Sequence, residues 1–448
     1  MRFGNEALLT DLYQLTMVYG YWKERIAEHE AVFHLYFRKK PFKGGFALAA
    51  GLDDVVGYIE SLKFSPSDLE YLSHFFERPF LDFLSKFTFQ CDVDAVPEGS
   101  LVFPQEPLLR VRGPLWQAQM LESPLLNRVN FETLIATKAA RICLAAHPDP
   151  VVEFGMRRAQ GPDGAISASR AAFIGGCEST SHVLAGKLFN IPVVGTQAHS
   201  WIMAFDEEVE AFRAFARSFP KGGILLVDTY DSLRGVQHAM DVARALKWPL
   251  KGIRLDSGDL GTLSIACRKL LDEQGFHETK IMASNELDEY AIHALKKQNT
   301  PICIWGVGTH LVTAKDQPAL DGIYKLAAIR KPGQPWKPKV KLSDQQDKAT
   351  NPGILQVRRA LNGQTYTGDV LYDEELGTKA KGKDLLIPLF RKGKFVGERP
   401  SLREIQAHAK NELSRLPESI KQLDRPQPYP VTLDPLLVKQ KQTLLKKL

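Results

Sequence analysis

Short apolar runs alternate with amphipathic segments through the middle of the chain. The runs end in polar residues or glycine, and they read PVVEF, IPVV, GGILLV, KGIRL, KIMA and PICIW. Segments with apolar residues at helical spacing, such as EEVEAFRAFARSF and DSLRGVQHAMDVARAL, separate most of them. Runs that are apolar on both faces are typical of buried parallel strands, and their alternation with helices predicts a parallel β/α architecture. Either a barrel or an open doubly wound sheet satisfies this pattern. For a barrel, about six strand units favour an irregular α/β barrel over a full eight-unit one.

The flanking segments predict a second α/β domain. Residues 1–115 contain the helix-like LTDLYQLTMVYGYW and the strand-like AVFHLYF. After about residue 325 the pattern turns to short strands, which need a sheet to join. We therefore predict four parts: an N-terminal α/β domain (1–115), an irregular α/β barrel with the active site (116–325), strands that return to and complete the N-terminal domain (326–398), and a C-terminal helical extension (399–448).

Composition narrows the function classes. The chain has 448 residues, of which 44% are hydrophobic and 25% are charged, as in ordinary globular proteins. No run is long enough to cross a bilayer, and Glu6 and Asp11 lie where a signal peptide needs an apolar core. We therefore expect a cytoplasmic protein that binds no membrane. The five cysteines lack C-x-x-C spacing, which indicates reduced thiols and no zinc site.

The charge pattern argues against nucleic-acid binding. The formal net charge is +6, and aromatic residues do not interleave with the basic ones. The basic segments are therefore interpreted as solvated faces, although a positive bias also suits a polyanionic small substrate.

Candidate chemistry follows the predicted strands, at the ends where parallel β/α folds place their active sites. GVGT (306–309) can bind a phosphate through backbone N–H groups and the Thr309 hydroxyl, or form a plain turn. DSGD (256–259) comes directly after a strand that carries Arg254. Its aspartates can hold ribose hydroxyls or magnesium, or cap the next helix.

Three further strand ends carry polar residues. EFGMRRAQG places Arg157 and Arg158 beyond a strand, and DTYD begins with Asp228, which could also be a helix cap. GTQAHS presents His199, which by itself is equally consistent with a packed core histidine and a functional one. The meeting of these groups at one rim predicts a polyphosphorylated substrate with a sugar.

These motifs together resemble the nicotinate phosphoribosyltransferase family. The resemblance rests on TDLYQLTM, EFGMRRAQG, GTQAHS, VDTYD, IRLDSGDL, ASNELDEY and GVGTHLVTAKDQPALDGIYKL, which occur in the family's order from residue 10 to about 330. It implies a homodimer whose active sites combine both subunits. It also implies synthesis of nicotinate mononucleotide and pyrophosphate from nicotinate and 5-phosphoribosyl-1-pyrophosphate in NAD biosynthesis, coupled to ATP hydrolysis with Mg²⁺.

The resemblance also implies roles for particular residues. His199 would be the phosphorylated histidine, and Tyr13 would reach across the dimer to stack on the pyridine ring. Nicotinate would contact Thr196 and Arg254, with Phe154 on the other face of the ring. The phosphoribosyl group would contact Gly308 and Thr309, with Asp256 near the ribose. Catalytic roles fall to His199, Asp256 and Arg254, and further substrate contacts to Arg157, Ser200 and Asp228; the magnesium ligands are not assigned.

Two departures from the family pattern leave alternatives open. Glu178 and His182 stand where the family commonly has an aspartate and the asparagine of Thr-Ser-Asn. A nicotinamide phosphoribosyltransferase shares the barrel and the histidine, and a catalytically weak nucleotide-binding relative is a third reading. Quinolinate phosphoribosyltransferase fits less well, because it has no use for a phosphorylated histidine.

Overall fold

A computed structural model describes residues 6–341 and 350–447. The chain divides into two compact units, one made of Met1–Thr137 with Ala319–Leu448 and the other of Lys138–Pro318. Small parts of the predicted domains, residues 1–5, 342–349 and 448, lie outside the described residues. In the part of the chain that is described, no helix combines the length and apolar character needed to cross a bilayer.

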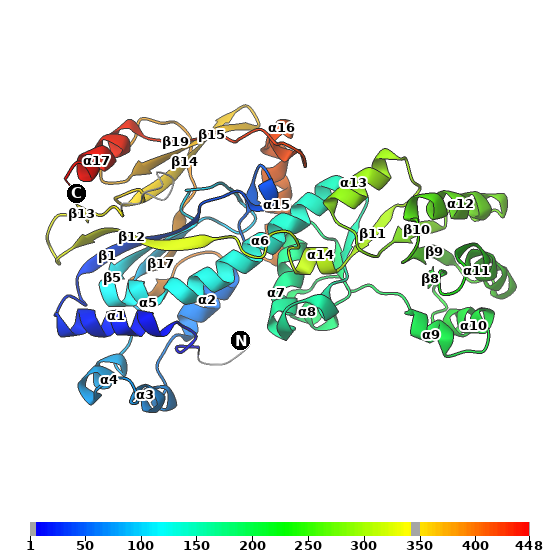
Figure 1. Cartoon of the computed structure of the whole chain (residues 1–448), viewed down its shortest axis with the longest axis horizontal. Helices are drawn as coiled ribbons and strands as arrows, with labels where there is room; N and C mark the ends of the chain where they lie inside the picture. The colour runs from blue at the N-terminus through cyan, green and yellow to red at the C-terminus, as the bar shows by residue number, and fades with distance from the viewer. Residues whose placement is uncertain (1–5, 342–349, 448) are drawn as a thin grey trace. The chain divides into compact units, whose positions relative to one another are not determined.

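The second unit is built on a curled six-stranded parallel sheet with the order β7-β6-β11-β10-β9-β8. In that order the strands are Ser179–Thr180, Val151–Glu153, Ile304–Val307, Lys280–Ala283, Leu250–Leu255 and Gly223–Leu226. Its helices include α7 (Gly161–Ile174), α8 (Val183–Phe189), α9 (His199–Met203), α10 (Glu208–Ser218), α11 (Ser232–Leu246), α12 (Leu260–Glu273), α13 (Glu289–Lys297) and α14 (Thr309–Val312). Helices α11 and α12 lie beside β8 and β9 (Figure 1). The predicted fold class, which combines an irregular α/β barrel with an N-terminal α/β domain completed by C-terminal strands, is confirmed.

Three of these helices begin at an aspartate that caps them. The carboxylates of Asp231, Asp259 and Asp288 accept backbone N–H groups of the first turns of α11, α12 and α13. Such caps satisfy donors that have no partner inside the helix. They explain why each helix starts within a few residues of the preceding strand.

One predicted strand is replaced by another. IPVV forms only a single bridge, between Val193 and Thr180, while the short β7 lies in the unpredicted segment CEST. Val193 and Val194 are 46% and 41% exposed. The β-branched run therefore lacks the covered surface that stabilises a strand, and β7 exists because it pairs with β6.

A side chain continues the barrel where strand pairing stops. With its amide oriented to satisfy both neighbours, Gln197 donates to the carbonyl of Ile224 and accepts from the N–H of Leu226, each at 3.1 Å. Both groups belong to the edge strand β8. The segment that pairs with β7 through Val193 thus also reaches β8, and it carries Thr196 and His199.

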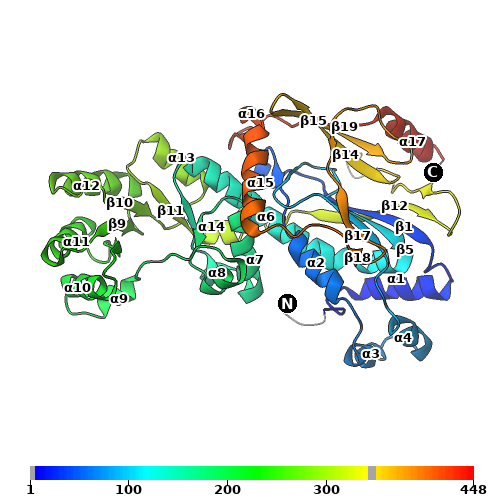
Figure 2. The same ribbon diagram turned by 180° about the vertical axis from the view of Figure 1, so that it is seen from behind.

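The first unit contains a seven-stranded antiparallel sheet in the order β13-β12-β1-β5-β3-β17-β18. In that order the strands are Lys337–Pro338, Gly322–Arg330, Glu30–Phe37, Leu109–Pro114, Asp92–Ala95, Ile387–Arg391 and Lys394–Phe395. Late strands therefore complete the N-terminal sheet, and Figure 2 shows β12 and β17 near β1 and β5. Seven of the eight residues of β1 are buried, which places this strand in the core.

Other late strands form a separate four-stranded sheet. Its order is β16-β14-β15-β19, with bounds Lys383–Asp384, Leu355–Asn362, Thr365–Asp373 and Val431–Leu433. A two-stranded sheet joins β2 (Ala47–Leu48) and β4 (Leu101–Val102). The helices of this unit include α1 (Leu12–Lys23), α2 (Leu52–Ser61), α3 (Pro66–Leu72), α4 (Arg78–Leu84), α5 (Leu115–Met120) and α17 (Pro435–Leu445), while α6 (Glu122–Ala146) continues into the second unit.

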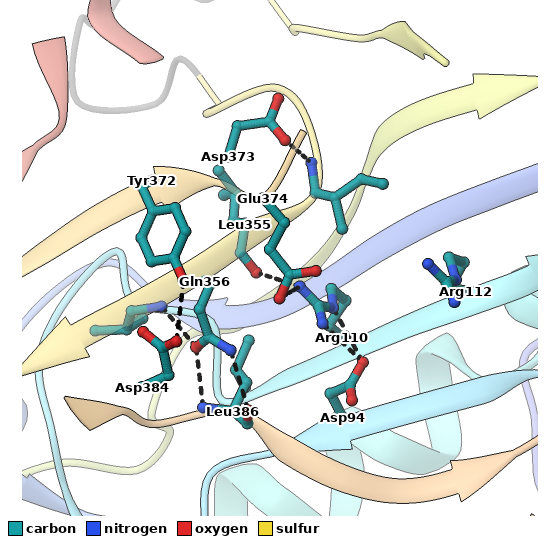
Figure 3. Close-up of polar contacts among 12 residues, drawn as sticks. Asp94, Arg110, Arg112, Leu355, Gln356, Tyr372, Asp373, Glu374, Asp384 and Leu386 are labelled. Atoms are coloured by element: carbon teal, nitrogen blue, oxygen red, sulfur yellow. Dashed lines mark hydrogen bonds and ion pairs between the residues drawn. The ribbon is translucent and has the colours of Figure 1, made fainter. Parts of the chain in front are cut away.

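A buried arginine connects the two larger sheets of the first unit. Figure 3 shows Arg110 pointing at Asp94 and Glu374, and its guanidinium lies 2.9 Å from each carboxylate. It also donates to the carbonyl of Leu355 at 3.0 Å. The N–H of Leu355 donates to Nε2 of His34, whose pKa burial and the nearby Arg110 lower to about 3. His34 is therefore neutral and acts as an acceptor.

The predicted C-terminal helical extension (399–448) is not one continuous helix. Helix α15 (Leu402–Arg415) begins with a capping box formed by Ser401 and Glu404 and ends before Pro417. A proline disfavours helical conformation in the residue before it. The short α16 (Glu418–Lys421) follows as a separate helix.

Candidate active site

A cavity of about 260 Å³ opens at the carboxyl ends of the barrel strands. The loops that follow β6, β7, β9, β10 and β11 all contribute to its walls, through Phe154, Ser181, Asp256, Ser284 and Thr309. The segment before α9 adds Thr196 and Gln197. The structure thus brings together five of the loops that carry the predicted motifs.

Arg254 is the most highly connected side chain of the cavity. Its guanidinium donates to the hydroxyls of Ser284 at 2.8 Å and Thr196 at 3.0 Å, and to the Asp256 carboxylate at 2.7 Å. Its central carbon lies 5.4 Å from the centre of the Phe154 ring. A guanidinium has five N–H donors, so two remain for a ligand. This geometry suits a carboxylate or phosphate that binds with two oxygens.

Glycines allow the loops of the cavity to approach one another. A Cβ on Gly306 would come within 2.9 Å of the Phe154 ring, and one on Gly155 within 2.2 Å of Val312. Real Cβ atoms do not approach heavy atoms so closely. The ring of Phe154 can therefore pack beside Arg254 only because β11 carries a glycine at this position.

His199 begins α9 and lies at the rim, with its side chain 41% exposed. Nδ1 lies 3.1 Å from the hydroxyl of Thr229, and Nε2 lies 3.8 Å from a carboxylate oxygen of Asp256. This histidine is not sealed in a hydrocarbon core. A hydroxyl on one ring nitrogen and an accessible second nitrogen are the arrangement that a phosphoryl acceptor requires.

The two aspartate-rich loops divide their carboxylates between helix caps and the site. Asp259 caps α12 and Asp231 caps α11, while Asp256 accepts from Arg254. Asp228 accepts from the N–H of Asp256 and the hydroxyl of Ser257, both at 2.7 Å. Its second oxygen is buried and has no hydrogen-bond partner among the described residues. The capping interpretation is therefore confirmed for Asp231 and Asp259, while a ligand-binding role of Asp228 and Asp256 stays a prediction.

The GVGT loop leads into a cluster that sequence reasoning missed. Gly308 and Thr309 line the cavity, and the next residue, His310, is buried. Nε2 of His310 lies 2.9 Å from Glu286 and 2.8 Å from Lys315. The available signal was the presence of three ionisable residues, His310, Lys315 and Asp316, in the segment that follows the glycines.

The remaining predicted residues occupy varied positions. Arg157 and Arg158 are exposed and line the cavity, whereas Ser200 is an exposed residue of α9. Tyr13 lies on α1 in the first unit, where 49% of it is exposed, and burial raises the pKa of its hydroxyl. Its predicted reach across a dimer stays a prediction.

The two departures from the family pattern have different environments. Glu178 is exposed. His182 is buried and precedes the first residue of α8, with Nδ1 3.2 Å from the hydroxyl of Ser169. The histidine is thus part of the packed interior, and the glutamate faces solvent.

Among the described residues, few side chains at or near the cavity could bind a metal ion. Within residues 6–341 and 350–447, no group of three or more His, Cys, Asp or Glu side chains is arranged to hold a metal. Asp256 lines the cavity, and Asp228 has a carboxylate oxygen without a partner in the described residues. Carboxylates of this kind fit a magnesium ion that takes its other ligands from substrate phosphates and water.

The fold and the site define an α/β-barrel enzyme with a cavity at the carboxyl ends of its strands. Models of the nicotinate phosphoribosyltransferase (NAPRTase) N-terminal domain, the NAPRTase family and its C-terminal domain match residues 8–130, 150–365 and 373–441.

Comparison with individual relatives and with a solved structure points to the same family. Nicotinate phosphoribosyltransferase of Bacillus subtilis (strain 168) is 42% identical over 455 residues, covering 95% of this chain and 92% of the relative. The human enzyme of that name is 35% identical over 521 residues, with coverages of 96% and 95%. The crystal structure of human nicotinic acid phosphoribosyltransferase matches with a TM-score of 0.86 at 32% identity, covering 97% of this chain and 99% of that chain. The chain belongs to the nicotinate phosphoribosyltransferase family.

Proposed function

We propose that the protein forms nicotinate mononucleotide and pyrophosphate from nicotinate and 5-phosphoribosyl-1-pyrophosphate, a step of NAD biosynthesis. The observation that carries this proposal is Arg254, held at the cavity by Thr196, Asp256 and Ser284 with two N–H groups left over. Those two donors match the carboxylate that distinguishes nicotinate from nicotinamide. The Phe154 ring beside the guanidinium supplies a flat apolar face for the pyridine.

The reaction needs orientation more than a protein nucleophile. The pyridine nitrogen forms a bond to C1 of the ribose while the bond from C1 to the pyrophosphate oxygen breaks, and the electron pair leaves with pyrophosphate. Arg254 and Phe154 would align the nitrogen with C1. The GVGT loop, through Gly308 and Thr309, would hold the 5-phosphate. Asp256 would contact the ribose, on which positive charge develops.

Magnesium would neutralise charge on the leaving pyrophosphate. Asp256 and Asp228 are the carboxylates that would add protein ligands to an ion that is carried mainly by the substrate.

ATP coupling would pass through His199. A neutral imidazole nitrogen is required as the phosphoryl acceptor, and the Thr229 hydroxyl beside Nδ1 leaves Nε2 for this role. The bond from Nε2 to phosphorus would form as the bond from phosphorus to the ADP oxygen breaks, and water would later release phosphate. The active enzyme would be a homodimer in which the partner's Tyr13 stacks on the pyridine ring.

The test is an assay of the full chain with nicotinate and the phosphoribosyl donor, with and without ATP. We expect nicotinate mononucleotide in both conditions, more of it with ATP, and acid-labile phosphate on the protein. Product from nicotinamide at a comparable rate would instead identify the nicotinamide enzyme. Tight ligand binding without any turnover would identify a catalytically weak relative.

A further inference from the structure

A fully buried carboxylate joins three segments of the second unit. Glu153, the last residue of β6, is 0% exposed. One of its oxygens accepts the N–H of Gly155, and the other accepts the hydroxyls of Thr180 at 2.5 Å and Ser169 at 2.9 Å. A buried charge persists only when its oxygens are satisfied in this way. Glu153 therefore connects the end of β6 with β7 and α7.

Two of these segments form walls of the cavity. Phe154 lies between Glu153 and its backbone donor Gly155, and Ser181 follows Thr180 directly. The N–H of Ser181 also donates to the carbonyl of Glu153 at 2.9 Å. The side chain and backbone of one residue thus fix both loops, although Glu153 does not itself line the cavity.

His182, one of the two departures from the family pattern, belongs to the same hydrogen-bond network. The Ser169 hydroxyl has one hydrogen and two acceptors within reach, Glu153 at 2.9 Å and the carbonyl of Ala165 at 3.0 Å. The carboxylate is the stronger acceptor. Ser169 then accepts from His182, which places the imidazole hydrogen on Nδ1, 3.2 Å away. The histidine extends the network outward from Glu153.

We propose that Glu153 is a positioning residue for nicotinate binding, acting through the loops that carry Phe154 and Ser181. The inference rests on the proposed function, since that function assigns the ring contact to Phe154. It predicts that removing the carboxylate loosens these two loops while the rest of the barrel keeps its structure. It also predicts that Glu153→Gln keeps nicotinate binding nearly unchanged. The amide oxygen of glutamine can accept from the N–H of Gly155, and its amide NH2 group can donate to the hydroxyls of Thr180 and Ser169.

The experiment compares Glu153→Ala and Glu153→Gln with the matched control Glu178→Ala, which alters an exposed glutamate of the same region. We expect Glu153→Ala to raise the KM for nicotinate by about tenfold or more, and Glu153→Gln to stay within about threefold of the wild type. Hydrogen exchange at the amides of Gly155 and Ser181 should become at least about tenfold faster in Glu153→Ala, with α12 unchanged.

Equal KM values and equal exchange in Glu153→Ala and Glu178→Ala would overturn the inference. So would exchange that accelerates across the whole second unit, because that result indicates only a loss of stability. If Glu153→Ala does not fold, Thr180→Val removes one donor to the carboxylate, and unchanged exchange at Ser181 would then refute the proposal. A wild-type protein without nicotinate activity would contradict the proposed function, whereas the exchange comparison would still decide the role of Glu153.

Discussion

Replacing Arg254 with lysine separates the charge of this residue from its geometry. The lysine ammonium keeps the positive charge, but its three N–H groups cannot contact Thr196, Asp256 and Ser284 in the present arrangement and still offer two donors to a ligand. Loss of one charge-assisted hydrogen bond to nicotinate, together with loss of orientation, should cost about 2–4 kcal/mol. That cost corresponds to a decrease in kcat/KM for nicotinate of roughly 30- to 1000-fold.

Steady-state kinetics with each substrate varied in turn measure this effect. The decrease should fall on nicotinate. The KM for the phosphoribosyl donor should change by less than about threefold, because its 5-phosphate is assigned to the GVGT loop and Asp256, assigned to its ribose, keeps the hydrogen bond from Ser284. Arg213→Lys, on the exposed surface of α10, is the matched control and should behave as the wild type. A kcat/KM for nicotinate within about twofold of the wild type in Arg254→Lys would refute the assignment of Arg254 to the carboxylate.

Three other perturbations test separate parts of the structure. His199→Ala should abolish both ATP stimulation and acid-labile phosphate while slow product formation persists, and the exposed His293→Ala should change neither. Glu289→Ala removes the buried carboxylate that two cations of α6 contact, so urea unfolding should show a loss of about 3–5 kcal/mol, against almost none for the exposed Glu278→Ala. The lowered pKa of His34, about 3, means that the folded state resists protonation. The free energy of unfolding should therefore fall by about 1.4 kcal/mol for each pH unit between about 6.5 and about 3. A His34→Gln variant should lose this contribution, and an unchanged pH dependence of its unfolding would contradict the assignment.

The barrel could be predicted because its signal is local. The strand β8 is a continuous apolar run, β9 and β10 are mostly apolar, and the helices after them show clear 3.6-residue periodicity. β7 could not be found in this way, since Ser179 and Thr180 carry no apolar signal and form a strand only through pairing with β6. Conversely, Val193 and Val194 have strand-forming side chains but no surface to cover them.

The sequence could predict which loops meet at the site, but it could not predict most of the hydrogen-bond partners of their side chains. Arg254 and Asp256 could be placed at one strand end from sequence alone, because parallel strands present the same end to the site. The partners Ser284 and Thr229 could not, since a serine or threonine hydroxyl in a loop has many equivalent uses. His310 was missed for a related reason: a buried histidine is satisfied by residues that the fold brings near, here Glu286 and Lys315.

The carboxylate of Asp256 lies close to the groups proposed for phosphoribosyl transfer and to the histidine proposed for phosphorylation by ATP. The last aspartate of DTYD and the last aspartate of DSGD each cap a helix, and the N–H of Asp256 donates to Asp228, which ties the loops together. Asp256 also lies 2.7 Å from the guanidinium of Arg254 and 3.8 Å from Nε2 of His199. A phosphoryl group on this nitrogen would bring negative charge next to the carboxylate that orients Arg254. Because charges at such separations interact strongly in a partly buried site, phosphorylation of His199 would change the position or charge balance of the group assigned to nicotinate, which provides a physical basis for ATP to alter substrate binding.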